Sequence, residues 1–135
     1  MLILLAKIVN TLHVREIYHG NLSPHNIFID LKDNSVTIDG YELLELRKYA
    51  NMFYKYKPIN VWSPPEVLQA SKMCEPAVAH DAYSFGLIMW EMFHTKVPFD
   101  NNIPECIKHV CSGERPKVEE AHTEPVANLI RLCWS

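Results

Sequence analysis

Long apolar runs are missing from this sequence. No segment of its 135 residues reaches the roughly 18 consecutive apolar residues that a membrane-spanning helix needs. The opening MLILLA is short, follows no basic residue and is interrupted by Lys7, so it does not predict a signal peptide. We therefore expect a cytoplasmic protein that makes no contact with a membrane.

An excess of positive charge is missing too. Thirteen Lys and Arg residues against sixteen Asp and Glu residues give a formal net charge of -3. Proteins that bind nucleic acid through its phosphates carry a basic surface. We therefore expect no nucleic-acid partner.

Cysteine pairs with metal-ligand spacing are absent. None of the four cysteines forms a C-x-x-C pair, and the seven histidines are scattered without ligand spacing. Reduced cysteines and no metal cluster are the expectation. With 48% apolar residues and no repeat or low-complexity tract, the chain has the composition of one globular domain with a core of its own.

The first forty residues predict a helix followed by a hairpin. Leu5, Ile8, Val9 and Leu12 recur at helical spacing and predict an amphipathic helix that ends near residue 13. Two short apolar runs at 27–29 and 36–38 are typical of strands, and the turn-forming residues between them predict an antiparallel pair.

The rest of the chain predicts three more helices. Residues 41–65 show no clean period, and Pro64-Pro65 argues against a helix there. Residues 81–93 are apolar nearly all round, which predicts a helix buried on every side, with Asp81 capping its start. Further helices are predicted at 104–111 and 126–134. The expected fold class is mainly α with a small β-hairpin.

Several short motifs occur in an order that resembles the C-terminal lobe of a protein kinase. HGNLSPHN (19–26) resembles the catalytic loop H-R-D-L-x-x-x-N, and WSPPE (62–66) resembles the W-x-A-P-E signature. HDAYSFGLIMWEM (80–92) is similar to the central helix of that lobe, and SGERP with LIRLCW resembles the tyrosine-kinase-like group. The resemblance implies that residues 1–135 are a partial kinase-like domain, truncated at both ends, with the N-terminal lobe absent.

The catalytic-loop match departs from the family where proton chemistry occurs. In active kinases the loop aspartate accepts the proton of the substrate hydroxyl. Asn21 occupies that position here, and a neutral carboxamide cannot accept the proton. Ser23 replaces a lysine that neutralises phosphate charge, and Gly20 replaces the usual arginine.

The metal-binding positions are only partly retained. Asn26 matches the asparagine that binds the metal. The second ligand, the aspartate of D-F-G, falls on Asp39 if the match is anchored on Asp39-Gly40. Strand alternation instead puts Val36, Ile38 and Gly40 on one face, so that Gly40 replaces the aspartate. We favour this second register and keep Asp39 as the alternative ligand.

The remaining matches are architectural. The resemblance implies that His19 packs under Tyr41, that Asp81 hydrogen-bonds the loop backbone and that Phe28 forms the floor of an adenine site. Glu66 matches a buried glutamate whose arginine partner would lie after the last residue. We therefore expect Glu66 to be buried and unpaired, which is costly for a carboxylate.

The resulting hypothesis is a pseudokinase that acts as a scaffold or allosteric regulator in signalling, with protein partners and a binding surface that includes residues 104–112. Its losses resemble those of the inactive testis-expressed kinase-like proteins. The alternatives are a divergent active serine/threonine or tyrosine kinase, and a gene-model fragment without independent function. ATP and Mg²⁺ are implied only by the family resemblance, and no cofactor is expected for the chain by itself.

Overall fold

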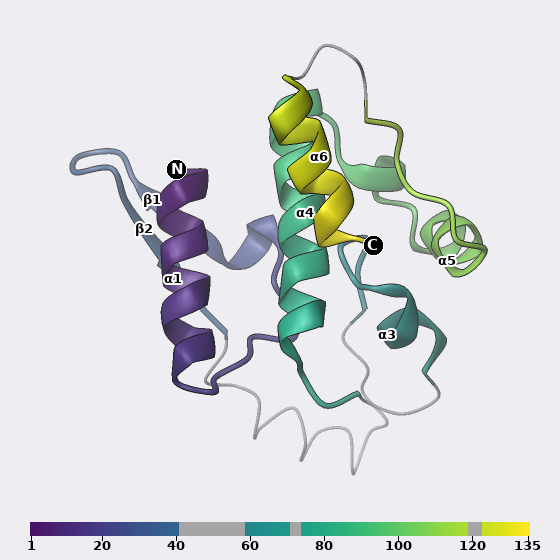
Figure 1. Ribbon diagram of the computed structural model, residues 1–135, viewed down its shortest axis with the longest axis horizontal. Coiled ribbons are helices and arrows are strands. Elements are labelled where there is room, and N and C mark those ends of the chain that lie inside the picture. Colours follow the sequence, from purple (N-terminus) through teal and green to yellow (C-terminus); the bar gives the residue numbers. More distant parts are fainter. Residues whose placement is uncertain (41–58, 71–73, 119–122) are drawn as a thin grey trace.

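A computed structural model describes residues 1–40, 59–70, 74–118 and 123–135. The described helices and strands are α1 (Leu2–Val14), η1 (Pro24–Asn26), β1 (Ile27–Asp30), β2 (Ser35–Ile38), α3 (Pro65–Gln69), α4 (Val78–His94), η2 (Pro98–Asn101), α5 (Ile103–Cys111) and α6 (Glu124–Cys133). These elements confirm the expected fold class, mainly helical with one hairpin (Figure 1).

Helix α4 is the centre of the core. Leu87 is fully buried and Ile88 and Met89 are nearly so, because neighbouring elements cover α4 from several directions. Helix α6 runs alongside α4 (Figure 1). Gly86 permits this close approach, since a Cβ at that position would lie 2.6 Å from the Cβ of Cys133.

The hairpin carries the predicted alternation. β1 and β2 pair antiparallel with Ile27 opposite Ile38, and β2 packs against α1. Ile38 and Gly40 are buried, whereas the intervening Asp39 and the preceding Thr37 are exposed. Ile38, the last residue of β2, and Gly40 just after the strand therefore point inward, whereas Asp39 between them is turned outward.

Three details correct the sequence-based expectations. Helix α4 starts at Val78 rather than at Asp81, so Asp81 lies within the first turn and is not the cap. Pro65 opens α3, contrary to the expectation of no helix, because proline is tolerated at the first helical position. The burial of α4 on every side is wrong for its last turn, where Met92 and Phe93 are 39% and 42% exposed.

In the part of the chain that the structure describes, no helix is both long enough and apolar enough to span a membrane.

Candidate functional site

The loop of residues 19–26 is held in place by one buried carboxylate. Asp81 is 1% exposed, and its Oδ2 accepts a hydrogen bond from the backbone N–H of His19 at 2.9 Å. Its Oδ1 accepts the N–H of Gly20 at 2.8 Å. The Nε2 of His13, at the end of α1, lies 2.8 Å from the same Oδ2. Helix α4 therefore fixes the start of the loop through Asp81.

His19 links this loop to the end of β2. Its Nδ1 accepts the backbone N–H of Asn21 at 3.2 Å, so the ring proton resides on Nε2 and is donated to the carbonyl oxygen of Asp39 at 2.8 Å. The side chain is 1% exposed. Tyr41, under which His19 was expected to pack, lies outside the described residues.

The carboxamide of Asn26 folds back onto the loop. Its Oδ1 accepts hydrogen bonds from the backbone N–H of Ser23 at 2.9 Å and from the hydroxyl of Ser23 at 3.1 Å. Its Nδ2 donates to the carbonyl oxygen of Asn21 at 3.0 Å. Both lone pairs of Oδ1 are therefore engaged within the loop.

The side chain of Asn21 contacts a residue far along the chain. The Nδ2 of Asn60 donates to the Oδ1 of Asn21 at 2.9 Å. The Oδ1 of Asn60 accepts the backbone N–H of Trp62 at 2.9 Å and the hydroxyl of Ser63 at 3.2 Å. Asn60 thus closes a local turn with one end of its carboxamide and contacts the 19–26 loop with the other.

Residues 59–64 are themselves anchored on α4. The indole Nε1 of Trp62 donates to Oε2 of Glu91 at 2.8 Å, and the hydroxyl of Ser84 donates to the carbonyl oxygen of Trp62 at 2.9 Å. Burial raises the pKa of the Glu91 carboxyl, and the bond from Trp62 partly offsets that rise. This 59–64 segment therefore approaches the 19–26 loop as part of the rigid core.

The two alternative positions for the second metal ligand, Asp39 and Gly40, directly follow β2 and differ in their surroundings. The Oδ1 of Asp39 accepts the adjacent N–H of Gly40 at 2.6 Å, and the residue is exposed. Gly40 is buried with φ +90°, a conformation that residues with a Cβ adopt rarely. Position 40 therefore faces the interior without a side chain, and the carboxylate of position 39 lies on the opposite face.

Phe28 and Glu66 lie away from the hydrogen-bonded loop. Phe28 lies on β1, opposite Thr37 of β2. It is 55% exposed, so much of its ring lies on the surface. The expectation of a buried, unpaired Glu66 is wrong. Glu66 lies in the first turn of the short helix α3, and its side chain is 50% exposed. Its Oε1 lies 3.3 Å from Nε2 of His80.

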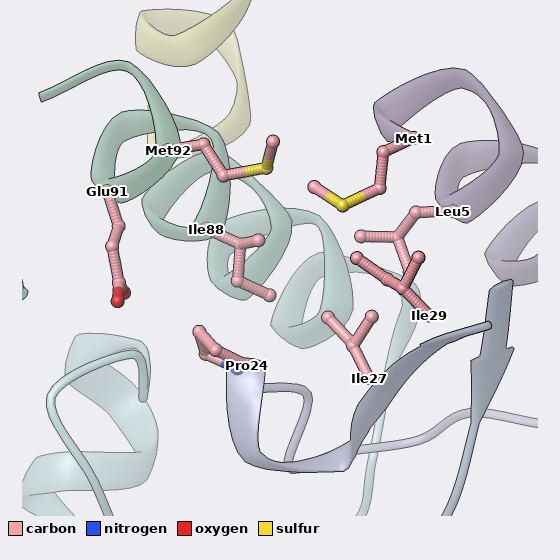
Figure 2. A pocket seen from close by; sticks show the side chains of 8 residues that line it. All are labelled: Met1, Leu5, Pro24, Ile27, Ile29, Ile88, Glu91 and Met92. Atoms are coloured by element: carbon pink, nitrogen blue, oxygen red, sulfur yellow. The ribbon is translucent and has the colours of Figure 1, made fainter. Parts of the chain in front are cut away.

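An apolar groove lies beside the loop, between α1, β1 and α4. Its cavity measures about 150 Å³. Figure 2 shows Met1 and Met92 at its sides, with Ile27 and Ile88 nearer its floor. The lining residues are Met1, Leu5, Pro24, Ile27, Ile29, Ile88, Glu91 and Met92. Glu91 is the sole ionisable side chain of this described lining, which therefore offers no Lys or Arg side chain to bind a phosphate group.

The hydrogen bonds described above fix the shape of the 19–26 loop, but the loop contains few side chains that could take part in catalysis. Within the described residues, the 19–26 loop carries no carboxylate, and no group of three or more His, Cys, Asp or Glu side chains is placed to hold a metal ion. Sequence reasoning did not find Asn60, Ser23 as a partner of Asn26, or His13. The signal available for Ser23 was its spacing three residues before Asn26, which is typical of a capping interaction.

Comparisons with known proteins agree with this architecture. The sequence profile described as protein tyrosine and serine/threonine kinase matches residues 1–135. A protein of Acanthamoeba polyphaga mimivirus, whose name describes a serine/threonine-protein kinase/receptor, is 31% identical over 119 residues, covering 87% of this chain and 7% of the relative.

Two cellular relatives show the same pattern. The human receptor-interacting serine/threonine-protein kinase 1 is 28% identical over 144 residues, covering 91% of this chain and 21% of the relative. The dual specificity protein kinase shkD of Dictyostelium discoideum is 29% identical over 132 residues, covering 93% of this chain and 17% of the relative. The chain thus spans less than a quarter of the length of each of these three relatives.

Proposed function

This chain belongs to the protein tyrosine and serine/threonine kinase family, and from that premise we propose that it is a pseudokinase lobe of the tyrosine-kinase-like group. Its role is to present a protein-binding surface in signalling as a scaffold or allosteric regulator. It does not transfer phosphate.

The observation that carries this proposal is the side chain at position 21. The proton acceptor of active kinases is a carboxylate, whereas Asn21 is a carboxamide whose Oδ1 already accepts a hydrogen bond from Asn60. A carboxamide oxygen can orient a hydroxyl but cannot take its proton at neutral pH. General-base assistance contributes about 10²–10⁴ in rate, and this part of the rate is lost.

The metal positions support the same proposal. Mg²⁺ requires near-octahedral oxygen ligands, and here Asn26 directs its Oδ1 to Ser23 while Gly40 has no side-chain oxygen. Asp39, just after β2, is exposed. The described residues therefore do not fit a divalent metal ion.

The packing around Gly20 supports the same proposal, because it leaves no room for the arginine that active members have at this position. Gly20 has φ +68°, and a Cβ there would lie 2.7 Å from the Cβ of Pro76. An arginine at position 20, as in active members, would collide with Pro76. The backbone and the surroundings of position 20 therefore suit glycine and exclude the arginine of active members.

The surface that this proposal assigns to partners includes α5 and the residue after it, 104–112. Helix α5 buries Cys106 and Val110 in the core, and burial raises the pKa of Cys106 to about 11, so this thiol is inert. The opposite side of the helix carries Glu105 and Lys108 at the surface. A helix that is anchored in the core by buried side chains and carries charged side chains on its outer face is suited to recognising a protein partner.

A phosphate-transfer assay on the full-length protein tests the proposal. Wild-type protein should remain at the background rate with ATP and Mg²⁺, and so should Asn21→Asp, because Gly40 still supplies no metal ligand. The matched control is the variant with Asn21→Asp, Ser23→Lys and Gly40→Asp, which restores the three missing groups together and tests whether their combined loss accounts for the absence of phosphate transfer. Metal-dependent phosphate transfer by the wild-type protein would overturn the proposal in favour of a divergent active kinase.

A further inference from the structure

Asn60 makes a contact that neither the family membership nor the proposed function assigns. It joins the 59–64 segment to the 19–26 loop through a hydrogen bond between two side-chain carboxamides, Asn60 Nδ2 to Asn21 Oδ1, at 2.9 Å. The residues are 39 positions apart. A hydrogen bond between such distant positions restrains two segments relative to each other rather than shaping a local turn.

The direction of this bond follows from the neighbouring donors. The backbone N–H of Trp62 can only donate, so the atom of Asn60 that faces it, at 2.9 Å, must be Oδ1. The remaining end of the Asn60 carboxamide is then Nδ2, a donor. The atom of Asn21 that it meets must therefore be an acceptor, Oδ1.

Both partners are held firmly. The backbone N–H of Asn60 donates to the Ser63 hydroxyl at 3.0 Å, and Ser63 is 6% exposed. On the loop side, the carbonyl oxygen of Asn21 accepts Nδ2 of Asn26 at 3.0 Å. Because the backbone of Asn21 and the side chain of Asn60 are restrained before they meet, forming the bond costs less entropy than it would between two free residues.

We infer that Asn60 is a positioning residue that latches the 59–64 segment onto the 19–26 loop through Asn21. Kinase activation segments are commonly ordered by a phosphate group that pairs with arginine. A latch of two neutral carboxamides orders this segment without any added charge and at any pH near neutrality. The inference rests on hydrogen-bond geometry and is independent of whether the protein transfers phosphate.

Amide hydrogen exchange on the full chain tests the latch, and Asn21→Ala is the sharpest variant. It removes the side-chain atoms that Asn60 Nδ2 can reach at position 21 and leaves the bonds of Asn60 to Trp62 and Ser63 in place. The backbone amides of Asn21 and Ser63 should then exchange up to about tenfold faster, the effect of losing one hydrogen bond. The amide of Val110 in α5 is the control and should be unchanged.

Variants with aspartate test the same bond through charge. Asn21→Asp keeps the acceptor and should retain protection. Asn60→Asp alone should also retain protection, because the Asn21 carboxamide can rotate so that its Nδ2 donates to the new oxygen. The two changes together make two carboxylates face each other, and exchange at Ser63 should then be at least as fast as in Asn21→Ala. The variants at position 21 leave the Asn60 turn intact and decide the question even if Asn60→Asp fails to fold.

Two results would overturn the latch. One is wild-type exchange rates at Asn21 and Ser63 in Asn21→Ala. The other is wild-type exchange rates at Ser63 when Asn21→Asp and Asn60→Asp are combined, which would mean that the two side chains do not meet.

Discussion

Asp81 is the residue on which the 19–26 loop depends most. Its carboxylate accepts the N–H groups of His19 and Gly20 and contacts His13, all while nearly inaccessible to solvent. Removing a buried carboxylate leaves its donors without partners, and the cost of breaking such a buried set is about 3–5 kcal/mol. We therefore expect Asp81→Ala to lower the free energy of unfolding by that amount in chemical denaturation.

The control for this prediction is Lys7→Ala. Lys7 is exposed on α1, and substitutions at such positions change stability by about 0.5 kcal/mol or less. Equal effects of the two substitutions would show that Asp81 does not anchor the loop.

The sequence could predict which residues form the site better than it could predict their partners. The loop motif singled out His19, Asn21 and Asn26 together, because a motif reports residues that are close in the chain. The contact between His13 and Asp81 spans 68 positions and the one between Asn60 and Asn21 spans 39. No periodicity or local spacing carries information over such distances, so these partners required the folded structure.

The last turn of helix α5 carries a histidine that contacts two carboxylates. His109 places Nε2 2.7 Å from Glu105 Oε1 and Nδ1 2.5 Å from Glu114 Oε2, and its ring stacks on Phe99. Only the imidazolium form donates through both nitrogens. Glu114 first, and Glu105 second, raise the pKa of His109 above its usual value, and Lys108 beside Glu105 is the nearest other charge.

The pH dependence of this contact follows from the sign of the shift. Because the pKa of His109 is higher in the folded than in the unfolded protein, its contribution to stability is complete below about pH 6 and is lost as the pH rises through the folded value. An NMR titration should give a pKa for His109 above the usual one. His109→Gln should remove this part of the pH dependence of the melting temperature, and a pKa at or below the usual value would contradict the prediction.

Gly86 sets the distance between α4 and α6. Replacing glycine with alanine within a helix normally stabilises it by about 1 kcal/mol. Here the new Cβ would lie 2.6 Å from the Cβ of Cys133, so we expect Gly86→Ala to destabilise the protein by about 1–3 kcal/mol as an overpacked core does. Chemical denaturation measures the change.

A matched background isolates this contact. In Cys133→Gly the opposing Cβ is removed, so the cost of Gly86→Ala should shrink or reverse. The same cost in both backgrounds would show that another contact is responsible.

The sequence predicted which helices and strands form more accurately than it predicted the residues at which they begin and end. Helical spacing predicted α1, α5 and α6 within about two residues, a usual uncertainty at helix ends. Helix α4 begins three residues before Asp81 with Ala77 at its N-cap, and alanine gives no capping signal in the sequence. The short α3 was missed because five residues are too few to show a period, and its two prolines read as a break.

Viewed whole, the described molecule is a helical lobe organised on α4. The loop, the 59–64 segment and α6 all attach to this one helix, through Asp81, Ser84 and Gly86 respectively. The spacing of its apolar residues predicted the fold class, because each helical or strand pattern repeats within one short stretch of the sequence. The apolar groove of Figure 2 was not predicted, since it is lined by residues from α1, η1, β1 and α4 that only the fold brings together.

The central claim is that this site holds the shape of a kinase loop without its metal-dependent chemistry. The most direct test is a thermal-shift titration of the full-length protein with ATP, with and without Mg²⁺. A ligand at 100 times its dissociation constant stabilises a protein by about 2.7 kcal/mol, which is readily visible in a melting curve. We expect no Mg²⁺-dependent rise in the melting temperature, whereas a clear metal-dependent rise would show that Asn26 and Asp39 bind the metal and would contradict the account.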